Sequence, residues 1–257
     1  MPVAKITNLQ AMQYMDKRLK ADRIGARTYN NQLNYLRGGW TILEQRGYVA
    51  INIWKSIPIK KAPAKKRRAF TPYEAQTVIK RVREQDELLF YALLLQYCCF
   101  IRPKELSRLR RRHVDLQRGI VEVPGREAKS HEERFPSIPR SFLSYFDAQF
   151  WDRIQPNEIV FSKGWVAGGT SSCGRNQMNN RHRRVLEDLL EEGALDNIEG
   201  LSWYSWKDTG ISEALEQLPL IIVQDQAGHT SPDMTLKYRT KRGRNERFGN
   251  EFENKLL

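Results

Sequence analysis

A tyrosine follows a Gly-His pair at a spacing that suits chemistry, near the C-terminal end of the chain. Gly228-His229 opens a polar turn, and a short helical run then ends at Tyr238, nine residues after the histidine. A tyrosine oxygen becomes an effective nucleophile when a neighbouring group takes its proton. Histidine exchanges protons near neutral pH. The pair therefore predicts covalent catalysis, with Tyr238 as the attacking group and His229 as a partner in proton transfer or hydrogen bonding.

Arg102 stands where an apolar segment gives way to a new helix, in the run Ile101-Arg102-Pro103-Lys104-Glu105-Leu106. A guanidinium fits a phosphate through two parallel hydrogen bonds, and the start of a helix also favours an anion. Glu105, three residues later, could orient the guanidinium. Taken alone, the two residues also fit an ordinary surface ion pair.

Two lysines complete the set of candidate residues. Lys129 lies in a polar turn between two predicted strands, where it could reach into a nucleic-acid groove or protonate a leaving oxygen. Tyr204 and Lys207 are three residues apart just before a helix, so both could face one site. Read singly, each lysine also fits a solvated surface residue. Together with Tyr238 they are the parts needed to attack a phosphate diester without a metal or other cofactor.

Two helices are predicted at the start of the chain, over residues 7–22 and 27–46, with Thr7 as the first N-cap and Gly47 just after the second helix. Residues 48–58 are predicted to be extended or a short helix. The basic run that follows cannot bury itself, and it predicts a linker over residues 63–69. Residues 1–62 are thus expected to form a helical module.

A second domain is predicted over residues 70–257. Thr71, Pro72 and Glu74 form a capping box with proline at the first helical position. The Gly/Ser-rich segment 164–174 is expected to be a loop, and Trp203 and Trp206 are expected to be core residues. Helices are predicted over residues 72–84, 86–100, 103–111, 176–192, 205–217 and 219–227, and short strands over residues 119–123 and 133–138. The fold class is therefore mainly α with a small β-sheet.

The positive charge is concentrated in the first quarter of the chain. Residues 1–68 hold 15 lysines and arginines against 3 acidic residues, whereas the remaining residues hold 28 against 27. A basic module on a nearly neutral body predicts a polyanion as partner, and nucleic acid is favoured over a merely solvated surface. The expected DNA-binding residues are the cations of the predicted linker and its approach: Lys60, Lys61, Lys65, Lys66, Arg67 and Arg68.

The bulk composition places the chain among intracellular globular proteins. Cys98, Cys99 and Cys173 are odd in number, and two of them are adjacent in an apolar stretch, which favours buried thiols in a reducing cytoplasm over disulfides or a zinc site. The sequence contains no run of 18 apolar residues, and Met1–Lys5 does not resemble a secretory signal. We therefore expect no membrane association, no metal and no cofactor.

The order of these motifs resembles the tyrosine recombinase (phage integrase) family over essentially the whole chain. Arg102 with Glu105 matches the first arginine of the family in its R-x-x-E-L setting, and Lys129 matches the β-hairpin lysine. Gly228-His229 matches the L-G-H motif with Ala227 in place of leucine, and Tyr238 matches the nucleophile. The second box of the family reads His-x-x-Arg, whereas this chain has Tyr204 and Lys207 at the two ends of that box. A lysine keeps the charge but loses the bidentate fork.

The resemblance implies a two-domain DNA clamp, with a helical core-binding domain and an α+β catalytic domain. It implies cleavage and rejoining of double-stranded DNA through a 3′-phosphotyrosyl intermediate, in a homotetramer on paired sites. Arg102 and Lys207 would neutralise the transition state, Lys129 would protonate the leaving 5′-oxygen, and Tyr204 would donate to a non-bridging oxygen. Two alternatives stay open: a catalytically impaired recombinase-like DNA-binding protein, for which Lys207 is the reason, and a type IB topoisomerase.

Overall fold

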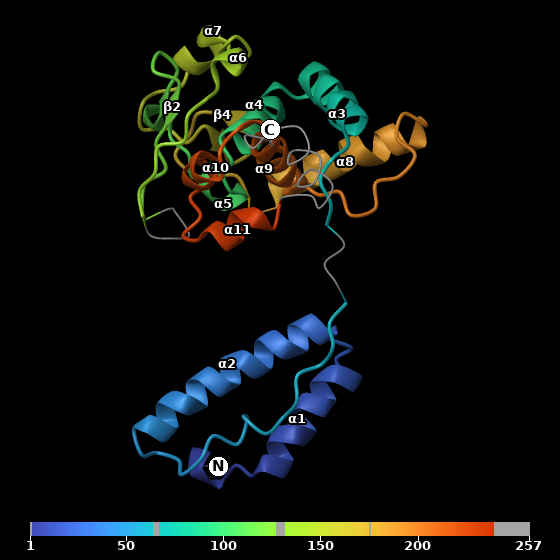
Figure 1. The fold of residues 1–257 in the computed structure, drawn as a ribbon, viewed down its shortest axis with the longest axis vertical. Helices are drawn as coiled ribbons and strands as arrows, with labels where there is room; N and C mark the ends of the chain where they lie inside the picture. The colour runs from blue at the N-terminus through green and yellow to red at the C-terminus, as the bar shows by residue number, and fades with distance from the viewer. Residues whose placement is uncertain (1, 64–66, 127–131, 175, 239–257) are drawn as a thin grey trace, which may run out of the picture. The chain divides into compact units, whose positions relative to one another are not determined.

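The computed structural model describes residues 2–63, 67–126, 132–174 and 176–238. The chain separates into two compact units, Met1–Lys65 and Lys66–Leu257. Each unit has its own hydrophobic core. Figure 1 gives the helices and strands with their labels.

The first unit is built on two helices, α1 (Asn8–Lys20) and α2 (Ala26–Gln45), which pack against each other (Figure 1). Thr7 caps α1 in a capping box with Gln10, and Gly47 takes up a positive φ of 74° just beyond α2. Both predicted helices and both predicted end signals are confirmed. A short 3-10 turn, η1 (Val3–Lys5), precedes α1.

The segment after α2 folds back onto the two helices as a series of turns. The Arg37 side chain donates to the carbonyl oxygens of Trp54 (3.1 Å) and Ile57 (2.5 Å), which fixes this segment along α2. The Trp54 ring stands edge-on to Trp40 and Tyr14. The buried hydrophobic residues of this unit are Ala11, Met15, Tyr29, Leu33, Ile53, Trp54 and Ile57.

The second unit is arranged around α4 (Glu87–Cys98), which is buried on nearly all sides. It packs against α3 (Pro72–Gln85), α8 (Gln177–Glu191) and α9 (Ser205–Gln217) (Figure 1). The predicted capping box at Thr71 and Glu74 is present, with Pro72 as the first residue of α3. The remaining helices are α5 (Pro103–Leu106), η2 (Arg111–His113), α6 (Arg140–Leu143), α7 (Ala148–Asp152), α10 (Leu220–Ala227) and α11 (Pro232–Leu236).

Helix α9 lies unusually close to α4. A Cβ atom added to Gly210 would stand 2.0 Å from the carbonyl oxygen of Tyr97, so only glycine permits this approach. On the same helix Trp206 stacks on Phe70 with ring centroids 4.2 Å apart, and Trp203 just before it is buried. The prediction that both tryptophans are core residues is confirmed.

The β structure differs in detail from the prediction. Two small antiparallel sheets are present, one pairing β1 (Val114–Asp115) with β2 (Ile120–Val121), the other pairing β3 (Phe161–Ser162) with β4 (Val166–Ala167). The second sheet occupies part of the segment predicted to be a loop. The predicted strand 133–138 is reduced to isolated bridges at Arg134 and Ser137, because Pro136 between them has no N–H for a ladder.

The helix predicted over residues 103–111 ends early, at Leu106. Tertiary pairing takes the backbone groups that would have continued it: the Leu109 carbonyl accepts from Val160 N–H at 2.8 Å, and Arg110 bridges to Ile159. This pairing joins the segment after α5 to the second sheet.

The last residues of the predicted linker belong to the second unit. The Arg67 guanidinium pairs with the carboxylate of Asp208, and Arg68 pairs with Glu74 at 2.6 Å. The Arg68 N–H also donates to the Gly200 carbonyl at 3.0 Å. Two carboxylates, one 141 positions from its arginine and one only 6 positions away, thus supply partners for this part of the charge run.

The three cysteines are buried free thiols, as predicted. Within the described ranges, none of the helices has the length and apolar character needed to cross a membrane.

Candidate active site

Arg102 and Glu105 lie together at the start of α5, as predicted. One carboxylate oxygen of Glu105 accepts from the Arg102 side chain at 2.9 Å, and the other accepts from the Arg102 backbone N–H at 2.8 Å. The second terminal nitrogen of Arg102 contacts the carbonyl of Gly228 at 3.4 Å. The guanidinium is therefore held between the start of α5 and the turn that carries His229.

A second guanidinium, that of Arg134, joins the same carboxylate and was missed by the sequence analysis. Its Nη2 donates to Glu105 at 2.6 Å, and its Nη1 donates to the Gln226 carbonyl at 3.0 Å. A Cβ atom on Gly228, which has a φ of +59°, would stand 2.6 Å from the Arg134 side chain. Arg134 thus connects three segments of the site: the segment after β2, the start of α5 and the turn after α10.

The electrostatics of this pair follow from its burial. Burial alone would raise the pKa of Glu105, but the adjacent guanidiniums of Arg134 and Arg102 hold it below its ordinary value. One ionised carboxylate therefore faces two fixed positive charges. The cluster carries an excess of positive charge, which favours an anion.

Lys207 lies near this cluster and is fully buried. Its amine donates to the Phe100 carbonyl at 2.6 Å and to the Ala227 carbonyl at 3.4 Å. Burial, followed by repulsion from Arg102 and Arg134, places its pKa well below the ordinary value for lysine. The side chain that sequence reasoning expected to touch the phosphate therefore joins the end of α4 to the end of α10 in this structure.

His229 sits at the end of the turn after α10, and it is buried. Its Nδ1 lies 2.9 Å from the Thr235 hydroxyl. Burial, then the charges of Lys207 and Arg102, lower its pKa to about 4, so the imidazole is neutral at pH 7. When Thr235 donates to Nδ1, the ring proton resides on Nε2, and that nitrogen becomes a hydrogen-bond donor.

Tyr238 follows α11 and is half-buried against the hydrophobic cluster that contains Phe100, Ile211 and Val223. Its ring lies parallel to that of His229, with an interplanar angle of 10° and centroids 5.9 Å apart. Burial, and then the neighbouring Asp208 carboxylate, raise the pKa of its hydroxyl above the ordinary value for tyrosine. The predicted nucleophile and the predicted histidine are thus in one site.

Tyr204 lies one helical turn before Asp208, at the start of α9, and Arg67 spans the two. The Arg67 guanidinium stands 4.3 Å above the centre of the Tyr204 ring and forms two hydrogen bonds to the Asp208 carboxylate. Burial raises the pKa of Tyr204. The signal that could have revealed Asp208 is its spacing of four from Tyr204, which puts both on one helix face.

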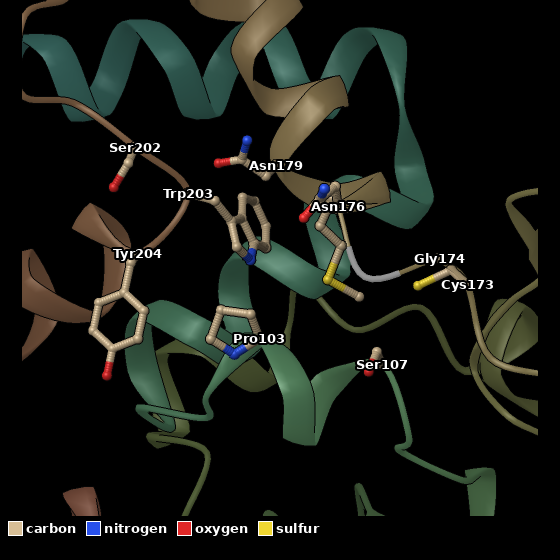
Figure 2. A pocket seen from close by; sticks show the side chains of 10 residues that line it. Pro103, Ser107, Cys173, Gly174, Asn176, Asn179, Ser202, Trp203 and Tyr204 are labelled. Carbon is tan, nitrogen blue, oxygen red and sulfur yellow. The ribbon is translucent and has the colours of Figure 1, made fainter. Parts of the chain in front are cut away.

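A pocket of about 200 Å³ adjoins this face of α9 (Figure 2). Tyr204 lies at one end of it and Cys173 at the other. The indole N–H of Trp203 is buried in its wall and finds no hydrogen-bond partner among the residues that the structure describes. Its remaining lining residues include the polar side chains Ser107, Asn176, Asn179 and Ser202.

The structure does not place the remaining predicted lysines in this site. Lys60 lies over the ring of Tyr29 at 5.6 Å in the first unit, and Lys61 is exposed. Lys129, Lys65 and Lys66 lie outside the described residues. Among the residues that the structure does describe, no group of three or more histidine, cysteine, aspartate or glutamate side chains is arranged to hold a metal ion.

No protein-family model matches the chain, and no curated protein sequence matches it. Solved structures do match over nearly its whole length. The Tn1549 transposon integrase in complex with transposon right end DNA is 13% identical, with a TM-score of 0.75, covering 97% of this chain and 87% of that one.

Two further solved structures match the chain over a similar share of its length. A lambda integrase dimer bound to a core site is 15% identical, with a TM-score of 0.68, and the match covers 99% of this chain and 84% of that one. XerA recombinase is 14% identical, with a TM-score of 0.58, covering 99% and 86%. The chain therefore has the fold of these integrases and recombinases.

Proposed function

We propose that the protein is a tyrosine-type site-specific DNA recombinase, which cleaves and rejoins DNA through a 3′-phosphotyrosyl intermediate. The observation that carries this proposal is the convergence of Tyr238, His229 and Arg102 from three separate segments on one charged site. The fold shared with integrases and recombinases supports it, and so does the order of motifs in the sequence.

In the proposed reaction the Tyr238 oxygen attacks the scissile phosphorus while the bond to the 5′-oxygen breaks. The energy of the phosphodiester is kept in the protein–DNA bond, so rejoining needs no ATP. Arg102 would bind the phosphate and stabilise the charge that develops in the transition state. Lys129 is assigned the protonation of the leaving 5′-oxygen, and Tyr204 a hydrogen bond to a non-bridging oxygen.

The position of Lys207 changes one part of the scheme. The amine is bonded to two carbonyl oxygens, so its role is assigned to support of the site and not to direct contact with the phosphate. Arg134, held on the same carboxylate as Arg102, keeps a second guanidinium in the site. This second guanidinium favours a working enzyme over a catalytically impaired DNA-binding protein.

Double-stranded DNA is the proposed partner, and the basic first unit is proposed to supply much of the contact with phosphates. A lambda integrase tetramer has been solved on a Holliday junction, and its match to this chain has a TM-score of 0.68. On that likeness we propose that this protein also assembles as a homotetramer on paired sites.

A nicked suicide substrate tests the proposed function, because loss of the short cleaved strand prevents rejoining and traps the covalent adduct. The wild-type protein is expected to form an adduct that survives denaturation, and Tyr238→Phe to form none while its DNA affinity stays nearly unchanged. Only one hydroxyl is lost, whereas binding rests on many phosphate contacts.

Tyr73→Phe, at an exposed tyrosine of α3, is the matched control and should behave as wild type. An adduct formed by Tyr238→Phe would show that the nucleophile is misassigned. Binding of DNA without any wild-type adduct would favour the impaired binder, and relaxation of supercoiled DNA irrespective of sequence would favour the topoisomerase.

A further inference from the structure

Tyr238 is held along one face of α9 at two points. Its backbone carbonyl accepts a hydrogen bond from Ser212 Oγ at 3.1 Å, and its hydroxyl hydrogen-bonds the Asp208 carboxylate. Asp208 and Ser212 are four residues apart, so their side chains project from the same face of the helix, one turn from each other. The tyrosine therefore spans that turn with its reactive oxygen at Asp208.

His229 is a poor acceptor for this proton when Thr235 donates to its Nδ1, because the ring proton then resides on Nε2 and neither ring nitrogen has a free lone pair. Its ring is stacked nearly parallel to the Tyr238 ring.

The contacts of Asp208 leave its carboxylate oxygens able to accept a further hydrogen bond. Its side chain is 10% exposed, and both of its oxygens are bonded by the Arg67 guanidinium. Each carboxylate oxygen has two lone pairs, so the Tyr238 hydroxyl can donate to an oxygen that Arg67 already contacts. Among the described residues, the charged and titratable groups facing Asp208 include Arg67, Tyr204, Tyr238 and, from its own helix, Lys207.

We propose that Asp208 is the general base of DNA cleavage and removes the proton from Tyr238 as that oxygen attacks phosphorus. The inference rests on the proposed recombinase function. The Oη–H bond breaks and its proton passes to the Asp208 carboxylate, the Oη–P bond forms, and the P–O5′ bond breaks with a proton supplied to the 5′-oxygen. In rejoining, the 5′-hydroxyl attacks phosphorus and Asp208 returns its proton to the departing tyrosine oxygen.

This assignment explains why a base is needed at all. Tyr238 lies in surroundings that disfavour the phenolate, so no reactive anion exists before the phosphate arrives. Its acidity rises sharply as the bond to phosphorus forms, and a carboxylate already hydrogen-bonded to it can take the proton at that moment. His229 is then left for the second role that the sequence suggested, a hydrogen bond to the phosphate.

Asp208→Asn tests the inference in single-turnover cleavage of the nicked suicide substrate. Asparagine keeps the shape of the side chain and one of the two oxygens that accept from Arg67, but it cannot accept a proton. The rate of adduct formation is expected to fall about 100-fold or more, within the usual contribution of a positioned base, with DNA affinity no weaker than wild type. Glu216→Gln removes one negative charge from an exposed site on the same helix, and it should leave the rate unchanged.

An Asp208→Asn rate equal to wild type would overturn the inference in favour of another acceptor. A faster rate would also overturn it, because the carboxylate would then merely hold the tyrosine back. Asp208→Ala provides a second test, in which added formate can occupy the vacated space. Formate should accelerate adduct formation by Asp208→Ala and not by Tyr238→Phe, and a DNA-binding Asp208→Ala protein that does not respond to formate would contradict the assignment.

The two levels of the proposal fail in different ways. A wild-type protein that binds DNA but never forms an adduct contradicts the recombinase function. A wild-type protein that forms the adduct, beside an equally active Asp208→Asn variant, contradicts only the role of Asp208.

Discussion

Helices α4 and α9 are both buried, lie against each other and are nearly equal in length, yet they bury opposite kinds of side chain. Along α4 the interior residues are leucines and aromatic rings, with Gln96 as a polar exception whose amide donates to the Trp203 carbonyl at 2.8 Å. Along α9 they include Lys207 and Asp208, beside the hydroxyls of Ser205 and Thr209.

The contrast indicates a division of roles within this helix pair: α4 stabilises the fold, and α9 carries charged groups of the candidate site. Burial of apolar groups stabilises the fold without requiring specific partners, whereas each buried polar group must find one. Lys207 finds two backbone carbonyls and Asp208 finds Arg67, so α9 can carry charge into the interior at the place where the site needs it. Changes in α4 should therefore affect stability, and changes in α9 and its partners should affect the reaction.

The largest expected effect on stability comes from truncating a buried side chain of α4. Leu93→Ala removes a fully buried side chain of α4 and should lower the free energy of unfolding by about 3 kcal/mol, through lost burial and a residual cavity. The cleavage rate per folded molecule should not change. Urea unfolding and single-turnover cleavage measure the two quantities, with the exposed Leu218→Ala as control. A lower rate per folded molecule would break the division between the two helices.

A smaller loss of stability is expected on acidification, because a neutral histidine is buried against a tryptophan of α9. His182 is buried and accepts from Trp206 Nε1 at 3.0 Å, and burial lowers its pKa to about 3. Between pH 6.5 and about 3 the unfolded chain binds a proton that the folded chain does not, so stability falls as the pH drops through this window.

The loss of stability caused by His182 should reach about 2 kcal/mol by pH 5 and should be absent above pH 6.5. His182→Gln keeps a hydrogen-bond acceptor but does not titrate, so its unfolding free energy should depend less on pH. Urea unfolding at pH 7 and at pH 5 measures the difference. Parallel pH profiles for the two proteins would contradict the prediction.

The smallest expected effect is on the cleavage rate, and it tests whether Arg134 supports the site. Arg134→Lys keeps the charge but cannot contact Glu105 and the Gln226 carbonyl together, so the Arg102 guanidinium and the His229 turn lose a shared support. Cleavage should slow about tenfold, equivalent to about 1.4 kcal/mol, with little change in substrate affinity. Arg108→Lys, on the short segment after α5, is the control. A change in affinity alone would instead indicate a simple DNA contact.

Much of the fold could be predicted from local signals. The Thr71-Pro72-Glu74 capping box and the spacing of apolar residues in the first two helices depend only on neighbours in the sequence, and the structure has them as predicted. The strand over residues 133–138 was predicted too long, because its extent depends on a partner and on Pro136, not on its own pattern. The early end of α5 has the same cause, since residues around 160 take up its backbone groups.

The candidate site could be predicted only in its motif residues. Spacing within the sequence identified Arg102, His229 and Tyr238, but it could not indicate that Lys207 would be buried, because a polar helix gives no sign of which face is covered. Arg134 and Asp208 were missed for a related reason. Their partners, Glu105 and Arg67, lie 29 and 141 positions away, and only the folded chain brings them together.

The contact between Gly210 and the Tyr97 carbonyl limits how this site can move. With no side chain to act as a spacer, the backbones of α4 and α9 meet directly, and neither helix can slide past the other without a clash. Asp208, two positions before that glycine, is therefore fixed in the frame of the domain. The tyrosine comes from a different part of the chain, beyond Gly228, whose left-handed backbone conformation separates α10 from the turn leading to α11. In mechanical terms, the carboxylate is fixed by the packing of two helices, whereas the nucleophile reaches it from a segment outside that pair.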